Sequence, residues 1–420
     1  MTQCDEVCAA GDSAMLNQGC RCEVADVESV RNTILAAIPA TKGADPTLRA
    51  HLFSPYALFV DRPALELMGA VARTVFEVAD NARYVERALA NAPAIARHDL
   101  GSTGGILGLD FHLTTAGPRL IEINTNPGGL LLNALLLDAV KSCAPLAWIP
   151  WTSGADARAL AIAAWLDDLQ AQLGRMPGRL ALVDVAPCDQ FLHPEFELYA
   201  TGFRERNVDT VILDPSELVV DGSRLRDTAG GIDAIYNRLT DFALASPECA
   251  PLAAAYLDRQ VALTPHPRAH AVFADKRNLE ILGDAALLES WGVNADTASL
   301  LAGTIPRTQE MKPHDRDTFW RDRGRYFFKP AAGYGSRGSY RGDKLTRKTW
   351  EAMAAIPYVA QEVAPPGTRI LHDGVTFKAD VRCFASERGV ILFSARLYQG
   401  QTTNMRTPGG GFATVLTTPA

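Results

Sequence analysis

The stretch GLDFHLTTAGPRLIEINTNPGGLLL, residues 108–132, constrains the fold of this chain more than any other. It holds two runs in which polar and apolar residues alternate, as they do in β-strands, on either side of a short turn. This spacing predicts a β-hairpin. Because side chains alternate between the two faces of a strand, Glu122 and Asn124 share one face, and the hairpin brings Asp110 beside them.

Three oxygen-bearing side chains on one sheet face, followed by a Pro-Gly-Gly turn, indicate a metal–nucleotide site. Hard oxygen donors suit Mg2+ that is held jointly by a protein and the phosphates of a nucleotide. The alternative is that the same side chains only line the solvated face of an ordinary hairpin. Residues 130–140 are then predicted to form a buried helix, and free N–H groups at such a helix N-terminus attract anions.

Residues 151–270 alternate between strand and helix patterns, which is typical of a small doubly wound domain of Rossmann type. Apolar runs at residues 179–185, 210–213 and 232–236 predict buried parallel strands. The region contains no G-x-G-x-x-G motif, so a dinucleotide site is not expected. Arg238 follows the last strand, where open α/β sheets bind ligands, and the alternative is an arginine in a surface ion pair.

A second informative stretch is YFFKPAAGYGSRGSYR, residues 326–341. It predicts a strand that carries Lys329 and then a glycine-rich loop, residues 331–338, which we call the flap. The flap departs from the Walker pattern because no Gly-Lys-Ser/Thr closes it. A strand-borne ammonium and unhindered backbone N–H groups nevertheless suit a polyphosphate. The alternative is a glycine-rich turn without a ligand.

The strands after the flap carry further charged side chains. Residues 358–363 are predicted to form one strand, and residues 377–385 and 390–396 are predicted to pair as a second hairpin. Period two puts Asp380 and Arg382 on one face, together with Lys378. Arg396 lies on the partner strand, and a polar, glycine-rich tail of residues 399–411 is predicted to finish the chain.

Length, composition and charge bound the class of protein. At 420 residues, with 47% hydrophobic and 21% charged residues, the chain is long enough for two or three globular domains or for one large α/β enzyme. A net charge of -7 argues against a general nucleic-acid binder, which needs a basic excess. No signal peptide is recognised, and the most apolar run, residues 130–140, is too short to span a bilayer. A cytoplasmic location is therefore expected.

Cysteines crowd the start of the chain, at Cys4, Cys8, Cys20 and Cys22. Their spacing matches no zinc-finger or ferredoxin pattern. We interpret residues 1–45 as a flexible extension with incidental thiols that ends in a helix at residues 24–37, and a soft-metal or redox site is the alternative. Residues 63–92 predict one long amphipathic helix or two in series. Small core residues are expected at the remaining cysteines, Cys143, Cys188, Cys249 and Cys383.

In combination, these motifs resemble the ATP-grasp superfamily. In its usual members the lysine and flap come first and the Glu-x-Asn pair comes last, whereas here Glu122 lies far ahead of Lys329. That order resembles the circularly permuted branch, typified by glutathionylspermidine synthase and eukaryotic glutathione synthetase. The resemblance implies an α/β (α+β) fold, with an ATP-grasp core in circularly permuted order and an inserted Rossmann-like, pre-ATP-grasp domain.

The resemblance also divides the chain into four parts. Residues 1–45 would be the Cys-containing N-terminal extension. Residues 46–150 would hold a helical segment and the metal-binding part of the ATP-grasp core. Residues 151–270 would be the Rossmann-like domain, and residues 271–420 the ATP-binding lid with the remainder of the core.

Carried over by position, the resemblance assigns roles to individual residues. Metal ligands for one or two Mg2+ ions would be Asp110, Glu122 and Asn124. Nucleotide contacts would come from two lysines, the flap and a hinge, namely Lys276, Lys329, Gly333, Gly335, Ser336, Gly338, Gln361, Glu362 and Val363. The arginine that commonly precedes the metal Asp by two residues is replaced by Gly108. Its catalytic charge is therefore expected from Arg382, Arg396 or Arg337.

The function implied by the resemblance is ATP-dependent ligation of a carboxylate to an amine, of the peptide type, through an acyl phosphate with Mg2+. Partners would be a small-molecule or peptide carboxylate and an amine, with no nucleic acid and no membrane. Alternatives are an ATP-dependent small-molecule kinase and a catalytically degenerate ATP-grasp binding protein, which Gly108 favours. Candidate substrate contacts are Arg238, Arg369 and residues 401–406.

Overall fold

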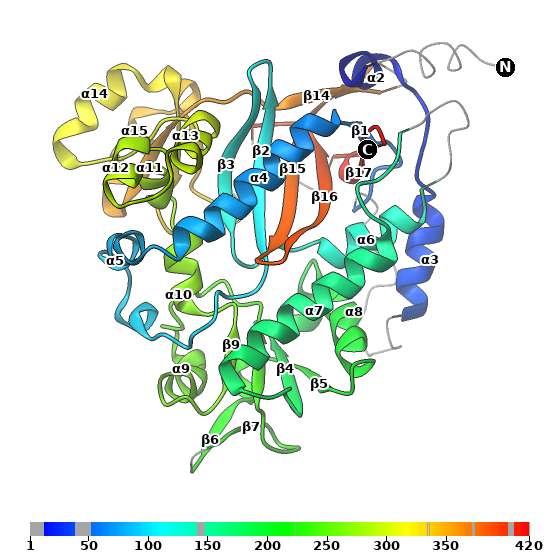
Figure 1. Cartoon of the computed structure of the whole chain (residues 1–420), viewed down its shortest axis with the longest axis vertical. Coiled ribbons are helices and arrows are strands. Elements are labelled where there is room, and N and C mark those ends of the chain that lie inside the picture. Colours follow the sequence, from blue (N-terminus) through cyan, green and yellow to red (C-terminus); the bar gives the residue numbers. More distant parts are fainter. Residues whose placement is uncertain are drawn as a thin grey trace.

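The computed structural model describes residues 12–37, 52–140, 148–222, 224–333, 335, 337–371, 374–401 and 407–419. Across these residues the architecture is mixed α/β, as expected, with one seven-stranded sheet, two four-stranded sheets and one two-stranded hairpin. Figure 1 shows the large sheet in the centre, a parallel sheet below it and a helix-rich lid at the upper left. None of the described helices combines the length and apolarity needed to cross a bilayer.

The central sheet is built from both ends of the chain, in the order β1-β17-β16-β15-β2-β3, with β14 pairing at one end of β15. Its strands are β1 (Leu58–Phe59), β2 (Leu107–Thr114), β3 (Gly117–Asn124), β14 (Gly367–Ile370), β15 (Thr376–Ser386), β16 (Gly389–Tyr398) and β17 (Gly411–Leu416). Both predicted hairpins, β2–β3 and β15–β16, are confirmed. The expectation that the chain finishes as a polar tail is wrong, because the wholly buried strand β17 follows the tail and pairs with β16 and β1.

Helices cover both faces of this sheet. On one face α4 (Arg62–Ala79) crosses β2 and β15 (Figure 1) and continues, after a break, as α5 (Ala82–Leu89), so residues 63–92 form two helices in series. The apolar side chains of α4 and of the sheet form one core, which includes Leu65, Met68, Leu109 and Val381. On the other face α6 (Leu130–Asp138) and α7 (Gly154–Leu173) share a second core with Phe384 and Leu392. Asp110 and Arg382 alternate with the first set of side chains and therefore face away from α4.

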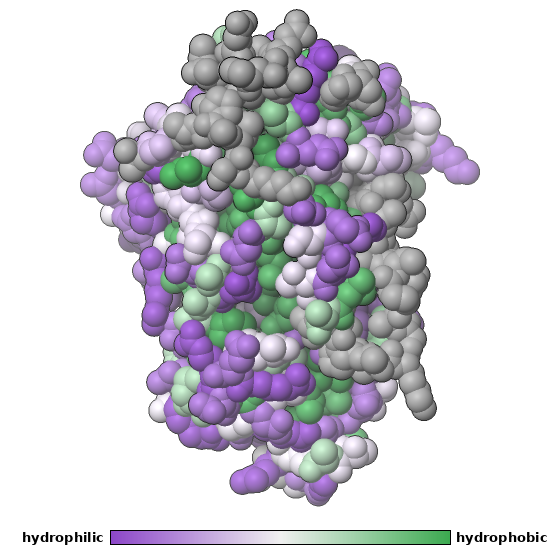
Figure 2. Space-filling view, turned by 90° about the vertical axis from the view of Figure 1, so that its right-hand side faces the viewer, coloured by the Kyte–Doolittle hydropathy of each residue, from purple (hydrophilic) through white to green (hydrophobic). Residues whose placement is uncertain are grey.

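The N-terminal segment is part of the fold, so the interpretation of a flexible extension is wrong for residues 12–37. Helix α2 (Ser13–Gly19) is followed by α3 (Val27–Ala37), which packs against α6. Figure 2 turns this side of the molecule to the viewer, with hydrophilic side chains at its edges and a band of hydrophobic ones down its middle. Cys20 is completely buried, whereas Cys4 and Cys8 lie outside the described residues.

Arg369 on β14 holds this segment in place. Its side chain is 0% exposed, and it donates to four backbone carbonyl oxygens, those of Asn17, Cys20, Ala57 and Ile370. The expectation that Arg369 contacts a substrate is therefore wrong, because its side chain is fully buried and its guanidinium donates to these backbone carbonyl groups. We call Arg369 and these four carbonyl groups the N-terminal clamp.

The parallel sheet has the predicted Rossmann-like character. Its order is β5-β4-β8-β9, and all neighbours are parallel. The strands are β4 (Arg179–Val183), β5 (Asp209–Leu213), β8 (Ala234–Asn237) and β9 (Ala262–Thr264), with helices α8 (His193–Arg204) and α9 (Ala250–Leu257) beside them. β9 was not predicted, because three residues are too few for a recognisable pattern. The small hairpin β6 (Val219–Asp221) and β7 (Arg224–Arg226) projects at the bottom of Figure 1.

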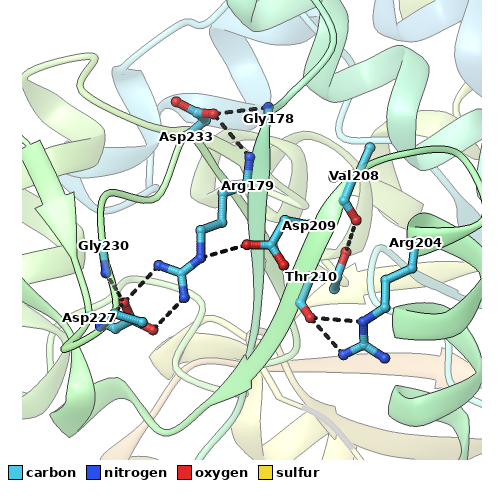
Figure 3. Close-up of polar contacts among 10 residues, drawn as sticks. Gly178, Arg179, Arg204, Val208, Asp209, Thr210, Asp227, Gly230 and Asp233 are labelled. Atoms are coloured by element: carbon cyan, nitrogen blue, oxygen red, sulfur yellow. Dashed lines mark hydrogen bonds and ion pairs between the residues drawn. The ribbon is translucent and has the colours of Figure 1, made fainter.

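A polar network closes the amino end of this sheet. Arg179, the first residue of β4, donates to both oxygens of Asp227, at 2.7 and 2.8 Å, and to Asp209 on β5 at 3.0 Å (Figure 3). The side-chain hydrogen bond from Arg179 is the main reason that the pKa of Asp227 is lowered to about 2. The amino end of the sheet is therefore occupied by structural contacts, which leaves its carboxyl end for ligands.

The lid is a second four-stranded sheet, in the antiparallel order β10-β13-β11-β12. Its strands are β10 (Thr308–Glu310), β11 (Tyr326–Pro330), β12 (Tyr340–Arg341) and β13 (Tyr358–Glu362). Helices α14 (Arg316–Arg321) and α15 (Arg347–Ala352) contribute to its core. Helices α11 (Asn278–Leu282), α12 (Ala285–Ser290) and α13 (Ala295–Thr304) lie in the same region of the molecule and pack into the core of α4 and the central sheet. Aromatic packing of Phe319, Phe328 and Trp350 forms the core that holds β11, and with it Lys329, in place.

Two of the four cysteines expected in the core are there. Cys249 and Cys383 are buried, and burial raises the pKa of the Cys383 thiol. Cys188 is exposed, so the prediction is wrong for it, because it lies in the turn after β4 rather than in the strand. Cys143 lies outside the described residues.

Candidate active site

The β2–β3 hairpin brings the acidic trio together as the alternation predicts. Asp110 and Glu122 lie directly opposite each other in the strand register, and the Asn124 amide donates to Asp110 at 3.3 Å. The register shifts between Asp110 and Phe111, which marks a β-bulge beside the trio. Three oxygen-bearing side chains therefore converge on one spot of the sheet.

Two arginines from the β15–β16 hairpin engage Asp110. Arg382, opposite Asp110 in the register, donates from Nε and Nη2 at 2.6 and 2.8 Å, and Arg396 Nη2 lies 3.0 Å from the same carboxylate. Arg396 also donates to the buried Asp380 at 2.6 Å. Burial alone would raise the pKa of Asp110, but the two guanidinium groups outweigh it and hold that pKa well below its ordinary value.

Gly108 leaves room for Arg382. A Cβ atom at Gly108 would lie 3.3 Å from Cδ and Nε of Arg382, and 2.6 Å from Cβ of Pro127. The space above position 108 is thus already taken by an arginine side chain that comes from the neighbouring strand. Arg382 thus brings a guanidinium group to Asp110, and its catalytic role stays a prediction.

Two buried lysines lie beside Glu122. Lys276 Nζ is 3.1 Å from Glu122 Oε1 and donates to the carbonyl of Gly333 in the flap at 3.0 Å. Lys329 donates to the carbonyl of Ile121 and to the side-chain oxygen of Gln361, both at 2.8 Å. Burial would raise the pKa of Glu122, but Lys276 and Lys329 lower it overall. The early acidic strand and the late lysine strand therefore meet.

The strands that carry Glu122 and Lys329 meet at a cavity of about 550 Å³ between the central sheet, the lid and the parallel sheet. One part of its wall carries the residues expected to bind a nucleotide and metal, which are Asp110, Glu122, Asn124, Lys329, Gly333, Gly335, Gln361, Glu362, Val363, Arg382 and Arg396. Another part of its wall comes from the parallel sheet and its loops, and includes Asp184, Phe196, Arg238 and Phe242.

Among the described residues, three of those predicted for the site do not line this cavity, namely Lys276, Arg337 and Gly338. Arg337 is exposed, and the carbonyl of Gly338 accepts a hydrogen bond from the hydroxyl of Tyr358 at 2.9 Å. Ser336 lies outside the described residues. Of the tail, Gln401 lines the cavity and residues 402–406 lie outside the described part of the chain. Arg382 and Arg396 are therefore the predicted catalytic arginines that the fold brings to the acidic trio.

The N-terminus of α6 is not open to an external anion. The backbone N–H groups of Gly129 and Leu131 donate to the two carboxylate oxygens of Glu195, at 2.8 and 3.0 Å. Glu195 is 0% exposed. The expectation that this helix end binds a ligand anion is wrong, because the carboxylate of Glu195 on α8 already accepts hydrogen bonds from its N–H groups.

Sequence reasoning overlooked Asp184 and the ring pair of Phe242 and His270. Asp184 directly follows β4, so the rule that singled out Arg238 after β8 could have found it. The rings of Phe242 and His270 stack with centroids 3.8 Å apart. No local sequence signal marks that pair, because it depends on a contact between two distant loops.

The residues of the trio fit a magnesium ion that is shared with a nucleotide. No group of three or more His, Cys, Asp and Glu side chains able to hold a metal is found among the described residues. Mg2+ commonly takes one or two carboxylates, water and substrate phosphates. Asp110 and Glu122 face each other across one strand pair, and Asn124 adds an amide oxygen, so this donor set matches that pattern.

The pKa of Lys329 gives a testable pH dependence. Burial, together with the charge of Lys276, lowers that pKa to about 8 against the opposing pull of Glu122. The ammonium is therefore present below about pH 8 and lost above it. We expect the affinity for a non-hydrolysable ATP analogue, measured by calorimetry, to fall about tenfold between pH 7 and pH 9. Lys329→Arg, which stays charged, should show no such fall, and a flat profile for the unaltered protein would contradict the assignment.

The fold and the cavity define an α/β protein in which a cleft lined by charged side chains of both signs separates a parallel sheet from a lid. A glutathione synthetase-like effector from Globodera pallida has a similar structure, with a TM-score of 0.56 at 10% sequence identity, covering 93% of this chain and 96% of that one. A protein described as a gamma-glutamylcysteine synthetase from Methylobacillus flagellatus matches with a TM-score of 0.50 at 12% identity, over 83% and 87% of the two chains. The ATP-grasp ligase PsnB overlaps more weakly, with a TM-score of 0.34 at 20% identity, over 56% and 75%.

No protein-family model matches the sequence, and no curated protein does. At these identities the likeness concerns the fold. It confirms the expected similarity of fold to a glutathione synthetase-like structure. The circularly permuted order and the division into four parts stay predictions.

Proposed function

We propose that this protein is an ATP-dependent ligase that joins a carboxylate to an amine through an acyl phosphate. The observation that carries the proposal is the meeting of Glu122 and Lys329, from distant parts of the chain, at one cavity. Lys329, Arg382 and Arg396 line this cavity, and Lys276 lies beside it, 3.1 Å from Glu122. Cationic side chains gathered at one buried cleft can neutralise the charge of a polyphosphate ligand.

The reaction has two steps. First, a carboxylate oxygen of the acid attacks the γ-phosphorus of ATP, the bond to the bridging oxygen breaks, and ADP leaves. Second, the amine attacks the acyl carbon, phosphate leaves with the electron pair of the C–O bond, and the nitrogen releases a proton to solvent. The carboxylate and the triphosphate repel each other, so the cations must offset that repulsion in the transition state. We assign this neutralisation of charge in the transition state to Arg382 and Arg396.

Each wall of the cleft then has a role. Lys329 and the flap would bind the phosphates. The Gln361 side chain holds Lys329 and also donates to Thr308, at 3.1 Å, so we assign adenine and ribose contacts to Glu362 and Val363. Asp110, Glu122 and Asn124 would hold Mg2+, which when bound would neutralise phosphate charge. The synthetase names of both structural neighbours support a ligase.

The alternatives remain a kinase that stops at phosphorylation and a degenerate ATP-grasp scaffold. Gly108 was the feature that favoured the scaffold. Because Arg382 fills the space above Gly108 and engages Asp110, the positive charge is present, and the structure gives the scaffold less support.

Hydroxylamine as a general amine tests the proposal. We expect ADP and a hydroxamate to form together from ATP, Mg2+, hydroxylamine and an acid drawn from a panel of amino acids and small peptides. Omission of Mg2+ should abolish both products. ADP formation without hydroxamate would favour the kinase, and nucleotide binding without ADP formation from any acid would favour the scaffold.

A further inference from the structure

The parallel sheet has a topological switch point beside the cleft. After β4 the chain adds β5 on one side and later adds β8 on the other side. The crevice at the carboxyl ends of two such strands is where open α/β sheets bind ligands. Asp184 directly follows β4 and Arg238 directly follows β8, and both line the cavity. Opposite charges thus stand at the two sides of this crevice.

Arg238 has donors to spare for an anion. Its side chain is 6% exposed, and Nη1 donates to the Asn126 side chain at 2.5 Å and to the Tyr236 hydroxyl at 3.2 Å. Glu195 lies 4.0 Å from Nη2, but its two oxygens already accept from the N-terminus of α6. Within the described part of the chain Nε has no hydrogen-bond partner. A buried guanidinium with unused donors suits a carboxylate.

Asp184 offers the complementary charge. It is 8% exposed, and one of its oxygens accepts the backbone N–H of Val185 at 2.8 Å. Burial raises the pKa of Asp184 to about 6, against the opposing charge of Arg238. The carboxylate is therefore ionised near neutral pH and can accept an ammonium group.

The walls between these charges are apolar and aromatic. Phe191, Leu192 and Phe196 line one part, and Phe242 stacks on His270 in another. Burial, helped by Lys276, lowers the pKa of His270 to about 3, so its ring is neutral and adds no charge to the wall. An uncharged side chain of the ligand would be favoured here.

From this arrangement we infer that the crevice binds the acid substrate as an apolar α-amino acid, with Arg238 on its carboxylate and Asp184 on its ammonium group. The inference rests on the proposed ligase function and names the substrate class for it. Arg238 donates to Asn126, two residues beyond Asn124, so the carboxylate that it holds lies next to the acidic trio and the expected phosphates. Asp184 and Arg238 are substrate-binding residues in this account.

Ligand-observed NMR with three probes tests the inference on the full-length protein. L-phenylalanine carries both charged groups, N-acetyl-L-phenylalanine lacks the ammonium, and phenethylamine lacks the carboxylate. We expect L-phenylalanine to bind at least about tenfold more tightly than either analogue, since each lacks one charge-assisted contact. Equal binding of L-phenylalanine and its N-acetyl form, or binding of none of the three, overturns the inference.

Asp184→Asn is the decisive variant, because it keeps the side-chain shape and the acceptor for Val185. It should weaken L-phenylalanine about tenfold and leave N-acetyl-L-phenylalanine unchanged. Asp209→Asn is the matched control, since Asp209 lies at the amino end of the same sheet and is 65% exposed. Equal effects of the two substitutions count against the inference.

Binding and turnover separate the two proposals. If the probes bind as expected but no acid supports ADP release, the ligase function fails and the amino-acid crevice stands. If acids support the joint formation of ADP and hydroxamate at rates that Asp184→Asn does not alter, the ligase function stands and the crevice assignment fails. Nucleotide affinity should stay within about twofold in Asp184→Asn, because Asp184 contacts no part of the nucleotide in this account.

Discussion

Glu122→Gln is expected to lower ATP-dependent turnover by on the order of 100-fold, which corresponds to about 3 kcal/mol of transition-state stabilisation. The substitution keeps the volume and removes the charge that faces Asp110, pairs with Lys276 at 3.1 Å and would bind the metal. The backbone hydrogen bonds of β3 do not depend on that charge. We therefore expect the melting temperature to change little, and ADP release together with thermal unfolding measures both effects.

Glu351→Gln is the matched control for this substitution. Glu351 is 68% exposed and pairs with Arg347 at 3.3 Å on the surface of α15. It should keep normal turnover, because exposed ion pairs contribute little and it lies outside the cleft. Turnover of Glu122→Gln within a factor of a few of the unaltered protein would remove the acidic trio from the mechanism.

Arg369→Met should cost at least about 3 kcal/mol in the free energy of unfolding, because each buried carbonyl that loses its partner costs about 1–3 kcal/mol. The four carbonyls of the N-terminal clamp lose their donors together, while methionine fills much of the volume. Denaturant unfolding followed by circular dichroism measures the change.

Arg347→Met controls for the loss of an arginine as such. Arg347 is 59% exposed, and its partner Glu351 is 68% exposed. Its removal should change the free energy of unfolding by no more than about 0.5 kcal/mol. If Arg369→Met were as mild as Arg347→Met, the clamp would not be what holds residues 12–37 on the fold.

Short sequence patterns predicted the features of the fold that depend on neighbouring residues in the chain. Period-two alternation in a short stretch was enough to place Asp110 opposite Glu122, since the hairpin turn fixes that register. Buried apolar runs predicted β4, β5 and β8, because a strand that is buried on both faces is apolar along its whole length. The pattern of residues 326–338 also predicted that Lys329 lies on a strand directly before the flap.

Contacts between distant segments could not be predicted in this way. The pairing of β2 with β15 makes Arg382 the partner of Asp110 and explains Gly108, yet no short-range pattern encodes that register. The burial of Cys20 under Arg369 and the filling of the α6 N-terminus by Glu195 arise in the same manner. In each case a residue's role depends on which strand or helix packs against it.

The strand order of the central sheet has a consequence for how the protein is made. The hairpin that carries Asp110 and Glu122 leaves the ribosome well before β15, the strand that β2 pairs with, and β17 follows later still. At about 5–20 residues per second, that hairpin waits on the order of 10–50 s for its neighbour. During this interval the edge of β2 that later pairs with β15 is open in the nascent chain. Translation speed and chaperone supply are therefore expected to influence the yield of folded protein.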